Sequence, residues 1–199
     1  MDAYSYSYAA VGNRKAIDKG LYDQMRADDI RLNQFPFYQY GDSWLVPAGK
    51  FYYEGIPASW IGNISYRFSG PQVNVTSDAH YMRSAEMYLL HAEASYENGK
   101  EAQAIQSLKA VADLRIGDTS YIDALSGADL ANEIDVQTRL ELFAEGKSYF
   151  LMKRQRKTIT RGSNWLDFTG DSFNHNDDKL TFEIPTNEIL FNPNITGQN

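Results

Sequence analysis

The segment over residues 81–96, YMRSAEMYLLHAEASY, constrains the fold more than any other part of the chain. Its apolar residues recur every three or four positions, which is the period of one face of an α-helix. Asp78 is a suitable N-cap before it, and Asn98-Gly99 is a stop signal after it. We therefore expect a helix from about residue 79 to Glu97. Its apolar face would carry Met82, Ala85, Leu89, Ala92 and Tyr96.

A second helical pattern follows at once, over residues 101–114. The connection is very short, so the two helices are expected to pack antiparallel. Small residues, Ala92 and Ala104, would let the two backbones approach closely. The order of small and large positions approximates a tetratricopeptide-type (TPR-like) unit. One such unit cannot bury both of its faces, so another element must cover the hairpin. The inward residues of the second helix would be Ala102, Ile105, Leu108 and Val111.

The expected cover is a third helix over residues 135–157, with a short helical lead-in at 128–134. Its apolar residues spread over much of the circumference, which indicates burial on more than one side. They are Val136, Leu140, Phe143, Ala144, Phe150 and Leu151. The fold class predicted is mostly α: a TPR-like helical hairpin plus a long C-terminal helix, with extensive irregular loops.

The rest of the chain has weaker patterns. Residues 1–78 mix Gly, Pro, Ser, Asn and aromatic residues, which predicts long loops with one short helix near 17–25 and extended pieces at 50–53 and 65–68. Residues 158–199 return to extended and turn structure, including 181–184. We expect a single domain over 1–199, made of a loop-rich region (1–78), a helical core (79–157) and an extended tail (158–199).

Composition and the absence of known motifs argue against several classes of function. A net charge of −7 without a large basic patch argues against nucleic-acid binding. The chain has no cysteine, which excludes disulfides and thiolate chemistry. There is no Gly-rich phosphate loop, nucleophile elbow or H-E-x-x-H motif, and DSFNHNDD lacks the Gly and Glu of a calcium loop. We therefore expect no enzyme activity, no cofactor and no metal.

Charged residues of the third helix invite two interpretations. Glu141 and Glu145 lie about one helical turn apart and are expected to be partners of Arg or of backbone rather than general acids. Four cations cluster at the end of the helix, where they either form an anion site or complement the helix C-terminus; the second is favoured. They are Lys153, Arg154, Arg156 and Lys157.

Aromatic residues gather in a short loop-like region that also holds Pro47, Gly49, Gly55 and Pro57. Flat rings stack on the apolar faces of sugars, while nearby Asp, Asn and Gln side chains bond hydroxyls, so the region suits a carbohydrate platform. Alternatively, the rings anchor irregular loops to the helices. The candidate ligand contacts are Trp44, Tyr52, Tyr53 and Trp60.

Several stretches match patterns that occur together in one family. The first helix matches R-x-x-E-x-x-L-x-x-A-E-A through Arg83, Glu86, Leu89, Ala92, Glu93 and Ala94; the next ends in Arg115; the third contributes Glu141, Leu142, Glu145, Gly146 and Arg154; and the terminus contributes Ile184, Pro185, Glu188, Ile189, Asn192, Pro193, Gln198 and Asn199. Asp29-Ile30-Arg31 looks like an earlier D-x-R element. In this order they resemble the C-terminal portion of the SusD/RagB family, glycan-binding lipoproteins of the outer surface of Bacteroidetes.

The sequence departs from this family in three ways. One extra residue lies between Pro193 and Gln198, which loosens the terminal match slightly. Ser148 and Leu151 stand where the family often has Arg and Asp, so one local ion pair is expected to be missing. The family's N-terminal half, which carries the signal peptide, the lipidated Cys and most tetratricopeptide helices, has no counterpart here. We expect a fragment. Arg83 and Glu86 are three residues apart on one helix face and, as a hypothesis, pair with each other or with groups of the long loops.

The resemblance implies capture of an oligosaccharide for nutrient uptake, as in polysaccharide utilization systems. It also implies a partner, a TonB-dependent outer-membrane transporter of the SusC type over which the full protein sits as a lid. The location would be the surface of the outer membrane, through a lipid anchor absent from this sequence. One alternative is a helical-repeat module that holds a protein partner and binds no sugar. A glycosidase ranks below both.

Overall fold

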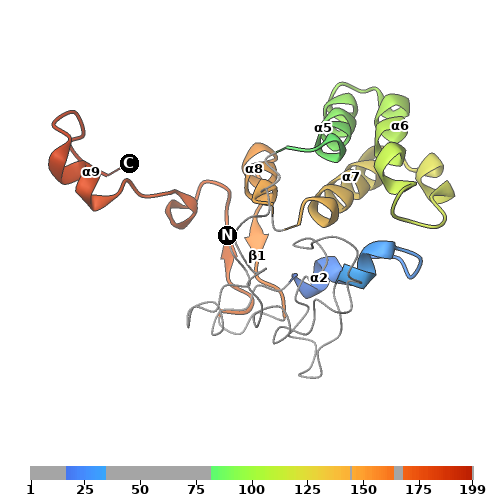
Figure 1. Ribbon diagram of the computed structural model, residues 1–199, viewed down its shortest axis with the longest axis horizontal. Coiled ribbons are helices and arrows are strands. Elements are labelled where there is room, and N and C mark those ends of the chain that lie inside the picture. The colour runs from blue at the N-terminus through green and yellow to red at the C-terminus, as the bar shows by residue number, and fades with distance from the viewer. Residues whose placement is uncertain (1–16, 35–81, 144, 164–167, 199) are drawn as a thin grey trace, which may run out of the picture.

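A computed structural model describes residues 17–34, 82–143, 145–163 and 168–198, and this part of the chain is mostly helical, as predicted (Figure 1). Its elements in order are α2 (Lys19–Tyr22), η1 (Ile30–Gln34), α5 (Ser84–Glu97), α6 (Glu101–Ala112), η3 (Ser120–Ala124), α7 (Gly127–Glu141), α8 (Lys147–Arg154), β1 (Ile159–Thr160), β2 (Ser172–Phe173), η4 (Asp178–Leu180) and α9 (Thr186–Phe191). The short α2 confirms the helix expected near 17–25. The expected extended pieces at 50–53 and 65–68 lie outside the described residues.

Helices α5 and α6 form the predicted antiparallel hairpin. The turn between them is made by Gly99, whose φ of 71° lies in the left-handed region that glycine adopts without strain. The Lys100 amide donates to the Ser95 carbonyl at 2.8 Å, and the Gly99 amide donates to the Tyr96 carbonyl at 2.9 Å. These two bonds are a Schellman motif, which satisfies the last carbonyls of α5.

The start of α5 differs from the prediction. The helix begins at Ser84, and Arg83 occupies the N-cap position with an extended backbone (φ −139°). Met82 therefore precedes the helix and is 62% exposed, whereas Asp78 lies outside the described residues. The reason is tertiary, since the extended backbone lets Arg83 reach Glu141 at the end of α7 and Glu145 just beyond it. In α6, Leu108 and Val111 are buried as predicted, whereas Ala102 is exposed and Ala104 is buried in its place.

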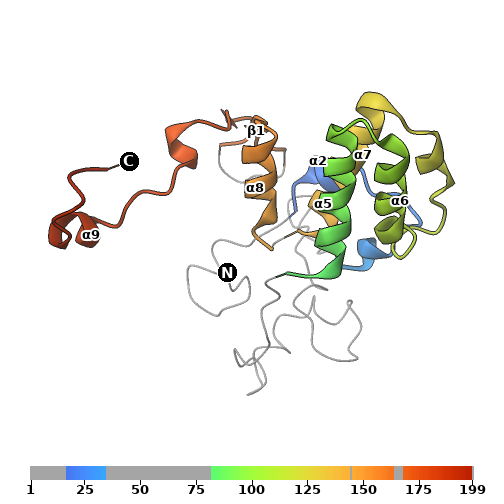
Figure 2. The ribbon, with the colours of Figure 1, turned by 90° about the horizontal axis from the view of Figure 1, so that it is seen from above.

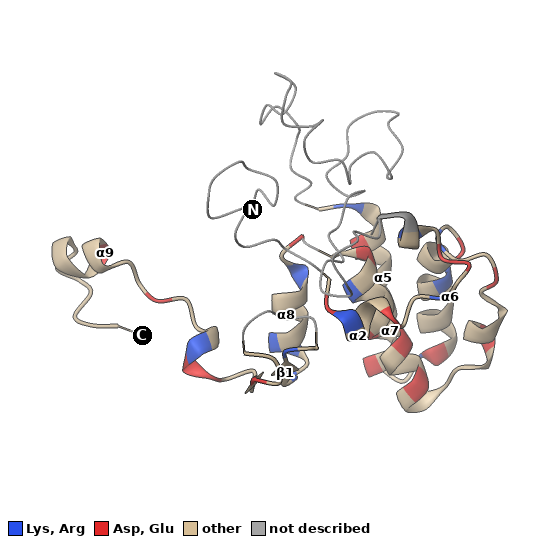
Figure 3. Ribbon diagram, turned by 90° about the horizontal axis from the view of Figure 1, so that it is seen from below, with Lys and Arg blue, Asp and Glu red and all other residues tan. Residues whose placement is uncertain are grey.

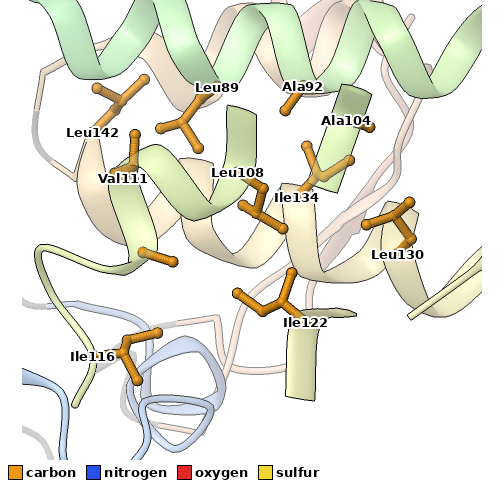
Figure 4. Packing of buried hydrophobic residues seen from close by; sticks show 11 residues of the cluster. Leu89, Ala92, Ala104, Leu108, Val111, Ile116, Ile122, Leu130, Ile134 and Leu142 are labelled. Atoms are coloured by element: carbon orange, nitrogen blue, oxygen red, sulfur yellow. The ribbon is translucent and has the colours of Figure 1, made fainter. Parts of the chain in front are cut away.

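Helix α7 covers the hairpin, as the third helix was expected to do. Apolar side chains of α5, α6 and α7 meet in one cluster (Figure 4). Ala92 and Ala104 are fully buried in it, which is consistent with a close approach of the two hairpin helices. The cluster consists of Leu89, Ala92, Ala104, Leu108, Val111, Ala112, Ile116, Ile122, Leu130, Ile134 and Leu142.

The other side of α7 is buried as well, which confirms the prediction of burial on more than one side. Val136 and Leu140 pack with Ile17 and Leu21 in a second cluster, so the short helix α2 lies against α7. Asp18 begins α2 by accepting from the Leu21 amide at 3.2 Å. Residues 17–22 are thereby held against the helical body.

A single helix over residues 135–157 was a wrong prediction. Helix α7 begins at Gly127 and ends at Glu141, and α8 begins only at Lys147. The break contains Gly146 at φ 76°, a left-handed conformation that ends a right-handed helix. In Figures 1 and 2, α8 stands apart from the three packed helices, on the side of α5. Its Phe150, expected to be buried, is 63% exposed, while Leu151 is buried as expected.

After α8 the chain forms a small antiparallel ladder and then an arm. Strands β1 and β2 pair Ile159 with Phe173 and Thr160 with Ser172. The C-terminal arm, residues 178–198, extends away from the helices (Figure 2). Residues 181–184, expected to be extended, form no strand, because no neighbouring strand pairs with them in the described part of the chain. None of the described helices combines the length and the apolar character needed to cross a bilayer.

Candidate functional site

The predicted ligand contacts Trp44, Tyr52, Tyr53 and Trp60 lie within residues 35–81, outside the described residues. The geometry that the structure describes is that of the charged motif residues. They gather in two places, one around Glu141 and one between α8 and its neighbours.

Glu141, the last residue of α7, holds the first group together. Its carboxylate accepts from the Arg83 Nη1 at 2.8 Å and from the Nε and Nη2 atoms of Arg115, both at 3.0 Å. Arg83 also donates from Nη2 to the Glu141 backbone carbonyl at 2.5 Å, which satisfies a helix C-terminal carbonyl. The Nε of Arg83 bonds both oxygens of Glu145, at 3.1 and 3.0 Å. The prediction that both glutamates are partners of arginine is confirmed.

A buried pair from the D-x-R element lies beneath this group. The Arg31 Nε and Nη2 atoms donate to the Asp29 carboxylate, at 3.0 and 2.7 Å respectively, and Nη2 also donates to the Gln137 Oε1 at 2.5 Å. The Arg31 Nη1 lies 3.6 Å from the Glu141 Oε2, at ion-pair distance. The six residues of the resulting Glu141 cluster carry three positive and three negative charges: Asp29, Arg31, Arg83, Arg115, Glu141 and Glu145.

The electrostatics of the cluster point to structure rather than catalysis. Burial by itself would raise the pKa of Glu141, but hydrogen bonds from Arg115 and Arg83 outweigh it and hold the pKa at about 2. Burial would likewise lower the pKa of Arg83, and its bonds to Glu145 and Glu141 raise it instead. A carboxylate that stays ionised and engaged by arginines has no proton to donate at neutral pH. The cluster therefore joins segments and does not act as a general acid.

The hypothesis that Arg83 and Glu86 pair with each other is wrong. Arg83 turns to Glu141 and Glu145, and the Glu86 Oε1 instead lies 3.1 Å from the Lys147 Nζ at the start of α8. Residues at i and i+3 on one helix face can meet, but Arg83 precedes the first turn of α5 with an extended backbone, and its side chain contacts Glu141 and Glu145 instead. Ser148 and Leu151 stand where the family often has Arg and Asp, yet α8 still forms an ion pair, the one between Lys147 and Glu86.

A second group of charged and polar residues holds the end of α8 against α5 and α7. We call it the α8 latch, and it consists of Glu93, Asp135, Arg154, Gln155 and Lys157. The Glu93 carboxylate accepts from the Arg154 Nε and Nη2, at 3.0 and 2.6 Å respectively, and from the Gln155 Nε2 at 3.1 Å. The Lys157 Nζ lies 2.7 Å from the Asp135 Oδ1. Burial would raise the pKa of Glu93, but the bonds from Arg154 and Gln155 lower it overall. Basic residues therefore occupy both ends of α8 (Figure 3).

An open groove of about 880 Å³ lies beside the α8 latch, between α5, α7 and the end of α8. Of the four cations clustered there, Arg154 and Lys157 are ion-paired, and the Lys153 Nζ lies 5.6 Å from the Tyr149 ring centroid. Arg156 has no side-chain partner within the described residues. The groove is lined by Leu90, Glu93, Ala94, Glu97, Ala131, Asn132, Arg154, Gln155, Arg156 and Lys157.

The motif at the C-terminus closes a loop within the arm. Pro185 precedes α9, and the Asn192 Nδ2 donates to the Glu188 Oε1 at 2.6 Å. Gln198 accepts from the Ile184 amide at 2.9 Å and donates to the Ile184 carbonyl at 2.8 Å. These motif residues thus have local structural roles. No group of three His, Cys, Asp or Glu side chains in the described ranges is placed to hold a metal ion.

Comparisons with known proteins found a matching family model and a solved structure with a similar fold. The model of the SusD family matches residues 63–199. No curated protein compared with the chain matches it. A crystal structure of a SusD superfamily protein from Bacteroides thetaiotaomicron VPI-5482 is similar, with a TM-score of 0.62 and 24% identity, over 90% of this chain and 39% of that one. At this identity the likeness shows the fold, and this chain spans 39% of the length of that protein.

Proposed function

The chain belongs to the SusD family, and on that premise we propose that it is part of a cell-surface protein that captures oligosaccharides for nutrient uptake. The family match over residues 63–199 is the observation that carries the proposal. Capture needs ring stacking and hydrogen bonds to hydroxyls, without cleavage of a glycosidic bond. The proposed activity is therefore binding and not catalysis.

The Glu141 cluster supports this proposal by its position along the chain. Arg31 lies just before residues 35–81, and Arg83 lies just after them. Both arginines converge on the same carboxylate, that of Glu141, with nitrogen–oxygen distances of 3.6 and 2.8 Å. The residues that flank the aromatic-rich segment on either side are therefore both held at the end of α7. Fixing both ends reduces the entropy that the segment would lose on binding a ligand.

Within that segment we propose Trp44, Tyr52, Tyr53 and Trp60 as the ligand contacts. Their rings combine a flat apolar face with, in Tyr and Trp, a polar edge, and this suits the alternation of C–H faces and hydroxyls on a sugar. The choice rests on their residue types and their spacing.

The proposed partner is a TonB-dependent outer-membrane transporter of the SusC type, and the proposed location is the outer surface of that membrane. Both proposals concern the whole protein, because this chain spans 39% of the length of the solved SusD superfamily protein. A lipid anchor carried by the whole protein would provide the attachment.

Isothermal titration against a panel of plant, host and microbial glycans tests the proposal. We expect saturable binding of at least one glycan, no release of reducing sugar, and about tenfold or greater weakening by Trp44→Ala or Trp60→Ala. Tyr88→Ala is the matched control, because Tyr88 is an exposed aromatic residue of α5 outside the segment. Release of reducing sugar would contradict a pure binding role. Absence of glycan binding together with capture of the transporter would favour the protein-interaction module.

A further inference from the structure

The end of α8 has an unusual residue at a position that favours glycine. The Lys157 amide donates to the Met152 carbonyl at 3.0 Å, and the Arg156 amide donates to the Lys153 carbonyl at 3.3 Å. This is the same Schellman motif that ends α5, with Arg156 at the place of Gly99. Arg156 has a φ of 54°, a conformation in which a side chain carries an energetic penalty. A strained residue that keeps its side chain invites a functional explanation.

The side chain of Arg156 is available for a ligand. Within the described residues its guanidinium makes no hydrogen bond, ion pair or ring contact, whereas its neighbours Arg154 and Lys157 are held by Glu93 and Asp135. It lines the groove between α5, α7 and the end of α8. A guanidinium offers five N–H donors in a planar fork that matches a carboxylate.

The rest of the groove is suited to a hydroxyl-rich anion. Its lining contains three cations and two carboxylates on a chain of net charge −7. Arg154 is paired with Glu93 and Lys157 with Asp135, so Arg156 is the lining cation without an ion-pair partner among the described residues, and Glu97 is the carboxylate without one. Asn132 adds an exposed amide, and Leu90, Ala94 and Ala131 add apolar surface. The volume of about 880 Å³ is in the range of small-molecule sites.

We propose that this groove binds an acidic sugar residue of the captured glycan. The carboxylate of a uronic acid lies on the Arg156 guanidinium, and ring hydroxyls bond the exposed amide of Asn132. The inference rests on the proposed glycan binding and adds the class of glycan, one that contains uronic acid. It places this subsite on the helical body, on α5, α7 and the end of α8.

Titration with two oligomers of equal length, one of galacturonic acid and one uncharged, tests the inference. We expect the wild type to bind the acidic oligomer more tightly, and Arg156→Gln to weaken that binding at least about tenfold while leaving the uncharged oligomer unchanged. Lys100→Gln removes the same charge from an exposed turn outside the groove and should change neither affinity. An acidic-oligomer affinity that is insensitive to Arg156→Gln, or a loss shared equally by the uncharged oligomer or by Lys100→Gln, overturns the inference.

Arg156→Gly separates binding from folding. Glycine suits the left-handed position, so this variant should melt no lower than the wild type and should still lose the preference for the acidic oligomer. If Arg156→Gly keeps that preference, the inference is wrong. If the uncharged oligomer binds and the acidic one binds no better, only this inference fails. If the wild type binds neither these oligomers nor any other glycan, the proposed function fails with it.

Discussion

The Glu141 cluster and the α8 latch use the same chemistry, arginine on glutamate, in different surroundings. The Glu141 side chain is 3% exposed and receives three arginines, two by hydrogen bonds and Arg31 at ion-pair distance. Glu93 is engaged by one arginine, Arg154, whose side chain is 45% exposed. The six described residues of the first group carry equal numbers of positive and negative charges, and their contacts hold segments together. The second lies beside an open groove in which the Arg156 guanidinium has no partner among the described residues, so a ligand can bind there.

The largest expected loss of stability is in the Glu141 cluster, the more buried of the two groups. Glu141→Gln should lower the free energy of unfolding by about 3–5 kcal/mol, because it leaves arginines without their counter-charge in a buried site. Urea unfolding followed by circular dichroism measures the loss. Glu97→Gln, an exposed carboxylate of α5 without a partner among the described residues, is the control and should stay within about 0.5 kcal/mol. If Glu141→Gln lowers the free energy of unfolding by less than about 1 kcal/mol, the Glu141 cluster contributes no more stability than the α8 latch, and the contrast between them is wrong.

Acid should weaken the Glu141 cluster in a defined window. The pKa of Glu141 is lowered from 4.5 to about 2 in the folded protein, so its ionised form stabilises the fold above pH 4.5 by roughly 3 kcal/mol. That stabilisation is lost as the pH falls from about 4.5 to about 2. Unfolding free energies measured at several pH values across this range should show the decline. Glu141→Gln should flatten it, and a decline of equal size in the variant would assign it to other carboxylates.

The α8 latch should respond less. Glu93→Gln is expected to cost about 1 kcal/mol or less, because the partner guanidinium of Arg154 is solvent-exposed and the pair is screened. A double-mutant cycle with Arg154→Ala isolates the pair from the loss of each side chain. A coupling energy as large as that between Glu141 and Arg83, measured in the same way, would contradict the contrast between the two groups.

The smallest expected change in stability is at the two Schellman motifs, which end α5 at Gly99 and α8 at Arg156. Arg156→Gly should stabilise the fold by up to about 1 kcal/mol, and Gly99→Ala should destabilise it by about the same amount. A Cβ at Gly99 would meet nothing within 4 Å, so its penalty is conformational and not steric. Thermal unfolding of both variants measures the pair. Stabilisation by Gly99→Ala, or a clear loss for Arg156→Gly, would show that backbone strain does not distinguish the two ends.

Sequence patterns predicted the hairpin well and the third helix only in part. Gly99 was read as a stop because Asn-Gly ends a periodic run, and it does end α5. Gly146 was just as visible, yet the apolar pattern continues past it through Phe150 and Leu151, so periodicity predicted one helix. The left-handed turn at Gly146 moved α8 beside α5, where Lys147 meets Glu86 and Arg154 meets Glu93. Periodicity reports faces within a helix and carries no information on such contacts.

The candidate site was foreseen as residue types and not as geometry. Glu141 and Glu145 are predicted to be partners of Arg or of backbone, and they do meet arginines. Arg83 is predicted to pair with Glu86 or with groups of the long loops, and the pairing with Glu86 is wrong. The roles of Arg31 and of the groove around Arg156 were missed, although the D-x-R element and the basic cluster were both noted. Trp44, Tyr52, Tyr53 and Trp60 stay predictions, because they lie outside the described residues.

The sequence by itself determined the family, the hairpin of α5 and α6 and the two-sided burial of α7, because these follow from periodicity, turn residues and motifs that are local along the chain. Only the tertiary structure decided which carboxylate each arginine meets, where the third helix breaks and which cation is left over. The physical reason is distance along the chain. Arg83 and Glu141 are 58 residues apart in sequence, and an ion pair between them exists only once the helices have packed.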